Sequence, residues 1–94
     1  MAVFVLLGRY SADAIKEISA ERTQKANQLA GNFGGNVKDV YALMGKNDLL
    51  IVAQFPGSGA ALQYSVALSR MTGISFTTSE AIPASTFDEL MGKI

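Results

Sequence analysis

Six polar residues of this 94-residue chain have types and positions that could do chemistry. Three are arginines, whose planar guanidinium groups bind carboxylates and phosphates through pairs of parallel hydrogen bonds. The others are a tyrosine, an asparagine and an aspartate beside two apolar segments. The set comprises Arg9, Tyr10, Arg22, Asn47, Asp48 and Arg70. If the fold gathers these residues at one end, they predict a site for a small anion, such as an organic carboxylate or a phosphate compound.

The same residues also have a purely structural interpretation. An arginine at a strand end can pair with Asp48, and arginines on helix surfaces are usually solvated. Asp48 follows Gly45, Lys46 and Asn47, a turn-forming sequence in which aspartate commonly accepts hydrogen bonds from the turn amides. Because turn chemistry alone explains Asp48, we expect its replacement by alanine to affect stability more than ligand binding.

The chain contains no cysteine and no histidine. This absence excludes disulfides, zinc sites with Cys or His ligands, and catalytic triads or dyads that use a histidine base. A metal site would need carboxylates alone, and no acidic cluster has a suitable spacing. We therefore expect no metal and no cofactor. A general base would have to be Asp48, Glu80 or Tyr41, and nothing in the sequence marks one of them as tuned.

Length and charge indicate a single small domain over residues 1–94. Eight basic and eight acidic residues balance, which argues against nucleic acid and anionic membranes because those partners need a basic face. The apolar start, Met1 to Leu7, is too short for a signal peptide or a membrane span. These features predict a cytoplasmic protein without nucleic-acid or membrane partners.

Two segments that we expect to be strands are apolar on both faces. Successive side chains of a strand point to opposite sides, so a sheet with one wet face alternates apolar and polar residues. The expected strands 2–8 and 49–55 instead carry continuous apolar runs. The expected strands 37–43 and 74–82 have polar breaks. The first pair therefore belongs inside a sheet, and the second pair belongs at its edges.

Serine and glycine mark the ends of the first helical region. Ser11 is expected to cap its start, and Ser19 is expected to cap a longer second part after a break. Gly34 and Gly35 end the region, because glycine accepts the left-handed conformation found at helix C-termini. The buried stripe is predicted to be Ala26, Leu29, Ala30 and Phe33, and Glu21 and Lys25 form a favourable i,i+4 pair.

Two further helices are expected in the second half of the chain. Ser58 is the predicted N-cap of the first, Gly73 its stop, and Ala61, Tyr64, Leu68 and Met71 its inner face. Thr86-Phe87-Asp88-Glu89 has the form of a capping box and predicts a short last helix with Leu90 and Met91.

The resulting order is βαββαβ plus a terminal helix, which is the ferredoxin-like arrangement of the α+β class. Its antiparallel sheet has the order 4-1-3-2, which makes the two continuously apolar strands central. Both helices of this fold cover one face, so the other face stays apolar and bare. Burying one Leu or Val side chain contributes roughly 1.5–3 kcal/mol. We therefore expect a homodimer or higher homo-oligomer that forms through the open sheet face.

This topology brings the six polar residues toward one pole. The first strand ends at Arg9 and Tyr10, and the neighbouring antiparallel third strand begins after Asn47 and Asp48. Arg70 lies at the end of the second helix at that pole, and Arg22 is within reach on the first helix. One aspartate cannot neutralise several arginines, which favours a bound anion. Pairing with Asp48 and solvation are the structural alternative.

Several short motifs resemble those of the GYD domain family. They are Arg22, Gly34-Gly35, Val37, Tyr41, Gly45-x-Asn47-Asp48, the apolar strand that follows, and Pro56. The resemblance covers nearly the whole chain and implies a ferredoxin-like fold related to the dimeric α+β barrel proteins. The chain departs from the family where Asn47 replaces the usual tyrosine and Gly57 replaces an acid. The family brings no established activity, so the resemblance supports the fold and a dimer of the α+β barrel type.

Three classes of function remain open. The first is a homo-oligomeric binding or regulatory module that holds a small anionic organic ligand between the sheet and a partner. The second is a cofactor-independent oxygenase or isomerase, as related dimeric barrels imply. The third is a structural or interaction domain. An RNA-binding function is rejected because the strands lack the aromatic and basic signature of RNA-recognition modules. A polar-lined cavity favours the first two classes, and a solid core favours the third.

Overall fold

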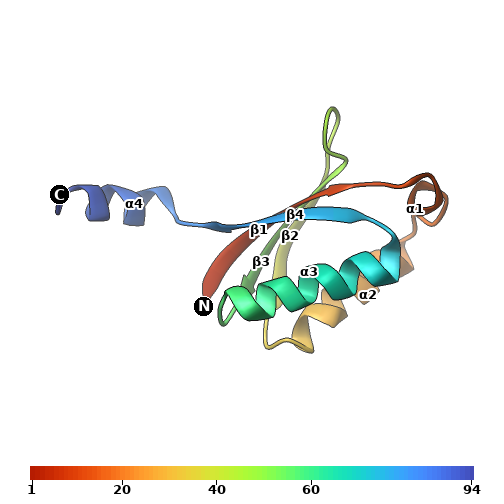
Figure 1. The fold of residues 1–94 in the computed structure, drawn as a ribbon, viewed down its shortest axis with the longest axis horizontal. Helices are drawn as coiled ribbons and strands as arrows, with labels where there is room; N and C mark the ends of the chain where they lie inside the picture. The colour runs from red at the N-terminus through yellow and green to blue at the C-terminus, as the bar shows by residue number, and fades with distance from the viewer.

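The structure is a computed structural model that describes all 94 residues. Its elements are β1 (Ala2–Arg9), α1 (Ala12–Lys16), α2 (Ala20–Gly31), β2 (Asn36–Ala42), β3 (Leu49–Phe55), α3 (Ser58–Thr72), β4 (Ser75–Ala81) and α4 (Ala84–Met91). The four strands form one antiparallel sheet in the order β2-β3-β1-β4. Helices α2 and α3 lie on the same side of the sheet, and α4 projects away from it (Figure 1). The α+β class, the ferredoxin-like topology and the strand order are confirmed. None of the helices has the length and apolar character needed to cross a membrane.

Side-chain alternation along the central strands produces two different sheet faces. Phe4 and Leu6 of β1 and Ile51 and Ala53 of β3 are buried under the helices. Their neighbours in sequence point to the opposite face, where the register pairs Val5 with Val52. That open face also carries half-buried Val3, Leu7 and Leu50. The apolar character of both faces, expected from the sequence, is therefore real, and only one face is covered by the chain itself.

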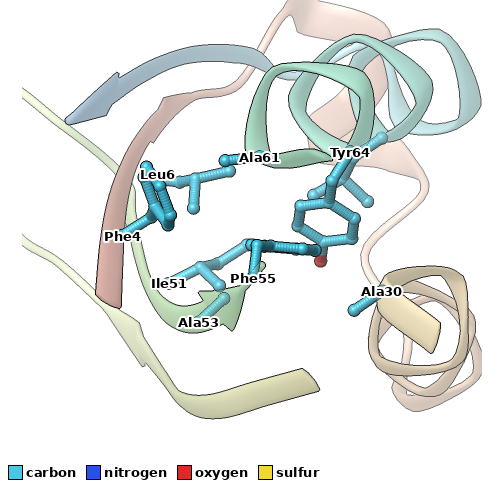
Figure 2. Packing of buried hydrophobic residues seen from close by; sticks show 9 residues of the cluster. Phe4, Leu6, Ala30, Ile51, Ala53, Phe55, Ala61 and Tyr64 are labelled. Atoms are coloured by element: carbon cyan, nitrogen blue, oxygen red, sulfur yellow. The ribbon is translucent and has the colours of Figure 1, made fainter. Parts of the chain in front are cut away.

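The core forms where α3 packs on the helix-covered face. Phe55 contacts Tyr64 with ring centroids 5.0 Å apart, and Phe4 meets Phe55 at 6.2 Å in an edge-on arrangement. The Tyr64 hydroxyl donates a hydrogen bond to the main-chain oxygen of Ala26 on α2 at 3.0 Å. Figure 2 shows Tyr64 lying between α3 and the Ala30 side of α2. This single side chain therefore joins the sheet and both helices.

The predicted start of each helix in the first helical region is confirmed. The Ser11 and Ser19 hydroxyls accept hydrogen bonds from the amides of Ala14 and Arg22, each at 3.0 Å, so each serine begins its own helix. Helix α2 ends at Gly31 with Asn32 as its C-cap, earlier than the predicted end at Gly34 and Gly35. Gly34, with φ +75°, lies in the turn that follows. Glu21 and Lys25 form the expected ion pair at 3.2 Å.

Three details of the later helices differ from expectation. The N-cap of α3 is Gly57 and not Ser58, which is the first helical residue and makes no capping bond. Helix α4 starts at Ala84 after Pro83, so the predicted capping box at Thr86 is wrong and Thr86 lies inside the first turn. Met71 is 43% exposed, and Thr72 is buried in its place. Gly73 ends α3 with φ +74°, as predicted.

One glycine is required by close packing and not by its conformation. A Cβ on Gly35 would lie 2.3 Å from both the Gln54 main-chain oxygen and the Phe55 ring. The chain leaving α2 therefore passes directly against β3 with no room for any side chain. This contact fixes how α2 and the first residues of β2 sit against the sheet.

Candidate functional site

A small cavity lies between the sheet and the helices, at the end where β1 leaves the sheet. Its volume is about 70 Å³, which exceeds the space needed for one water molecule several-fold. The apolar wall comes mainly from Leu49, Ile51, Leu68, Ile74 and Phe76, and the polar groups come from Tyr10, Ser19, Arg22, Thr23 and Thr72. The core is therefore not solid at this end, and the cavity combines an apolar interior with polar groups.

Tyr10 is held at the cavity by the main chain of β1 and by Asp48. The Tyr10 amide donates a hydrogen bond to Asp48 Oδ2 at 2.8 Å, and the Asp48 amide donates to the Gly8 oxygen at 2.8 Å. The prediction that the Asp48 side chain bonds the amides of its own turn is wrong. The reason is the antiparallel pairing of β1 and β3, which puts the amide after Arg9 directly within reach of the carboxylate.

Arg22 extends from the first turn of α2 across the Tyr10 ring. Its Nη1 donates to the Ala14 oxygen at 2.6 Å, and its guanidinium carbon lies 5.6 Å from the ring centroid of Tyr10. The hydrogen bond and the cation–π contact fix the guanidinium group in place. A guanidinium has five N–H donors, so donors remain for another acceptor.

The positive charge of Arg22 has no ion-pair partner. The ion pair between Glu21 and Lys25 is the only one in the structure. The predicted pairing of Asp48 with an arginine is therefore wrong, because the carboxylate bonds the Tyr10 amide instead. Arg22 thus presents a charge without an ion-pair partner beside an apolar cavity, and Glu17 and Glu21 line a neighbouring hollow with it.

The structure brings together three of the six predicted residues, Tyr10, Arg22 and Asp48. Arg9 and Arg70 are both exposed, and neither lines the cavity. Arg70 borders a different hollow, between α3 and β4. Asn47 is half-buried in the turn before β3 and also does not line the cavity.

Sequence reasoning missed several residues of the cavity wall. Val40 reaches it because the register of β2 shifts between Val37 and Asp39, a bulge that turns Val40 toward the helix-covered face. Thr72 is buried, and its hydroxyl is engaged twice, as donor to the Leu68 oxygen at 2.7 Å and as acceptor from the Ile74 amide at 3.2 Å. Thr72 could have been found from helical spacing, since it follows Leu68 by four residues. No sequence signal marks the bulge.

The arrangement is suited to holding an amphiphilic acid. A fixed guanidinium can bind a carboxylate, and the apolar wall can cover a hydrocarbon group attached to it. No group of three or more potential metal ligands gathers anywhere in the chain. The pKa of Tyr64 is raised to about 12 because burial disfavours the phenolate, but Tyr64 belongs to the core and does not line the cavity.

The family model of the GYD domain matches residues 4–91 of the chain. A search of curated proteins found no match.

Proposed function

The chain belongs to the GYD domain family, and we propose that it is a homodimeric binding module that holds a small organic acid in the cavity beside Arg22. The observation that carries the proposal is the fixed, unpaired guanidinium of Arg22 at the polar side of an apolar cavity. This location revises the expectation that a ligand lies between the sheet and a partner, because the cavity is on the helix-covered side.

The ligand is oriented by the two kinds of cavity surface. Its carboxylate accepts hydrogen bonds from the free N–H groups of Arg22, each contributing roughly 1.5–3 kcal/mol. Its apolar part contacts Leu68 and Phe76. A cavity of about 70 Å³ limits this part to a short chain or a single small ring. Solvent at the opening weakens the charge contribution as salt increases.

Binding is proposed ahead of catalysis because no poised base adjoins the cavity. The Asp48 carboxylate accepts a hydrogen bond from the Tyr10 amide and is not part of the cavity wall. The Thr72 hydroxyl is occupied as donor and acceptor.

A cytoplasmic location stays a prediction.

The dimer is proposed to form through the open sheet face. Val3, Val5, Leu7, Leu50 and Val52 create a continuous apolar strip along the two central strands on that face. Burying several such side chains, at roughly 1.5–3 kcal/mol each, supplies enough free energy to hold two chains together. Polar Gln54 borders the strip on β3.

Light scattering of two matched β3 variants tests the dimer. Val52→Lys adds a charge at the centre of the strip and is expected to break the open-face contact and lower the molar mass of the assembly. Gln54→Lys adds the same charge at its polar border and is expected to leave the dimer intact. A wild-type protein that is monomeric at micromolar concentration would contradict this part of the proposal.

Isothermal titration with short-chain and single-ring carboxylates tests the ligand site. The matching primary amides serve as uncharged controls. We expect Arg22→Gln to weaken carboxylate binding about tenfold or more, with Arg9→Gln and Arg70→Gln unchanged because these residues lie outside the cavity. Equal weak binding of every anion, insensitive to Arg22, would refute the site.

A further inference from the structure

Helix α4 stands apart from the body of the protein and has an apolar side with no partner. Every residue from Ile82 to Ile94 is exposed. The large apolar side chains of α4 are Phe87, Leu90 and Met91, which follow i, i+3 and i+4 spacing with exposures of 52%, 48% and 45%. Ile94 continues this spacing in the turn that follows the helix and is 96% exposed. This spacing is the anchor pattern of a helix that docks in a groove. An isolated helix of eight residues is marginal in water, so α4 needs packing to be stable.

The connection to β4 points α4 away from its own domain. Ile82 precedes a proline, which restricts it to extended conformations. Pro83 itself is extended, with φ −55° and ψ 141°. Two extended residues in succession carry the chain straight on from the end of β4, as Figure 1 shows.

A groove of matching character runs along the helix-covered side of the edge strand β4. It consists of two hollows, of about 340 and 370 Å³, that share Leu62 and Thr78. Leu62 and Val66 of α3 are 63% and 43% exposed beside it. Glu80 borders one hollow and Arg70 borders the other, so the two ends of the groove carry opposite charges.

We propose that this groove receives α4 of a second copy of the chain. On α3 the groove runs from Ser58 to Arg70, a span of about 18 Å, and α4 with the turn that follows it, from Ala84 to Ile94, covers about 15 Å. Asp88 and Glu89 lie at the Phe87 end of the apolar side, and Lys93 lies at the other end. The acids therefore meet Arg70 and the lysine meets Glu80 when α4 runs antiparallel to α3.

The direction of the chain selects a second copy over the same chain. Strand β4 begins at the Arg70 end of the groove, beside Phe76, and finishes at the Glu80 end. An α4 folding back into its own groove would run from Glu80 toward Arg70, which brings Lys93 to Arg70 and the acids toward Glu80. Exchange between two copies allows the favourable direction and forms two identical contacts related by a two-fold axis. The contact makes no use of the open sheet face.

Disulfide trapping tests the exchange, and a chain without cysteine gives no background. The double variant Val66→Cys/Leu90→Cys is oxidised mildly and examined by non-reducing electrophoresis and peptide mass mapping. We expect a covalent dimer whose disulfides join residue 66 to residue 90. The matched control Val52→Cys/Leu90→Cys, with its first cysteine on the open sheet face, is expected to give no such bridge between 52 and 90.

Each other outcome overturns the proposal. A monomer with an internal 66–90 disulfide means that α4 folds into its own groove. A 52–90 disulfide means that α4 covers the open face. Absence of a 66–90 bridge means that α4 does not dock in the groove. Adding Val52→Lys to the Val66→Cys/Leu90→Cys variant separates this proposal from the open-face dimer, since exchange through the groove retains the 66–90 bridge even if that dimer is lost.

Discussion

Replacing Tyr64 with phenylalanine is expected to reverse its effect on stability as the pH rises. The ring stays against Phe55, but the variant loses the hydroxyl that donates to the Ala26 oxygen at 3.0 Å. Loss of one such hydrogen bond costs about 1 kcal/mol. At about pH 8 the variant is therefore expected to be less stable than the wild type by about 1 kcal/mol.

Through the Tyr64 hydroxyl, alkaline pH changes the stability of the wild type but not that of the phenylalanine variant. Burial raises the pKa of Tyr64 from 10.0 to about 12 in the folded protein. Above pH 10 the unfolded chain releases the Tyr64 proton while the folded protein keeps it, so the free energy of unfolding falls with pH. The loss grows until the pH reaches the folded pKa and amounts to about 2–3 kcal/mol for a shift of this size. The stabilities of the two proteins are expected to cross near pH 11, above which the variant is the more stable.

Urea unfolding followed by circular dichroism at several pH values measures this difference. The two proteins differ only in the Tyr64 hydroxyl, so the difference between the two curves reports Tyr64 alone. Two parallel curves from pH 8 to 11.5, with a roughly constant gap, would refute the reasoning by showing that Tyr64 titrates alike in the folded and unfolded states.

Three further changes test other contacts by the free energy of unfolding or by binding. Asp48→Ala removes the acceptor of the Tyr10 amide and is expected to lower the free energy of unfolding by about 1–2 kcal/mol. Asp48→Asn should recover part of this loss, and an unchanged urea midpoint in Asp48→Ala would contradict the expectation. Gly35→Ala places its Cβ 2.3 Å from the main-chain oxygen of Gln54 and is expected to lower the free energy of unfolding by more than about 2 kcal/mol. The matched control is Gly59→Ala in the first turn of α3, where a Cβ meets nothing within 4 Å. This control should leave stability unchanged or raise it by up to about 1 kcal/mol. Equal effects of the two glycine changes would argue against close packing. Gly8→Ala places Cβ 2.9 Å from an aromatic ring of the cavity wall and is expected to weaken carboxylate binding in titration; unaltered affinity in a folded variant would contradict it.

The sequence predicts the fold well because its signals are local or periodic. The apolar runs of the central strands, the caps at Ser11 and Ser19, and the stop at Gly73 each depend on a few neighbouring residues. Cap positions one residue apart are harder to separate. Ser58 has the preferred cap side chain, yet the extended backbone at Gly57 begins the helix.

The candidate site is only half predictable because it depends on distances across the fold. Topology correctly brings Tyr10 and Asp48 together, but it cannot tell whether a carboxylate meets an arginine or a closer main-chain amide. Arg22 lies over the Tyr10 ring at the cavity, and no residue pattern encodes the space that remains beside them. The position of Arg70 near the end of α3 predicts that it belongs to the site. In the structure Arg70 instead borders the hollow between α3 and β4.

The register shift in β2 hinders edge-to-edge pairing between the sheets of two molecules. Edge strands expose unpaired main-chain groups and can nucleate aggregation unless the ladder is interrupted. In β2 the shift leaves the charged residue Lys38 without a partner, between Val37 and Asp39, which both keep their partners on β3. A second β2 strand could not form a continuous ladder along this edge. The bulge therefore guards the β2 edge of the sheet against fibre growth.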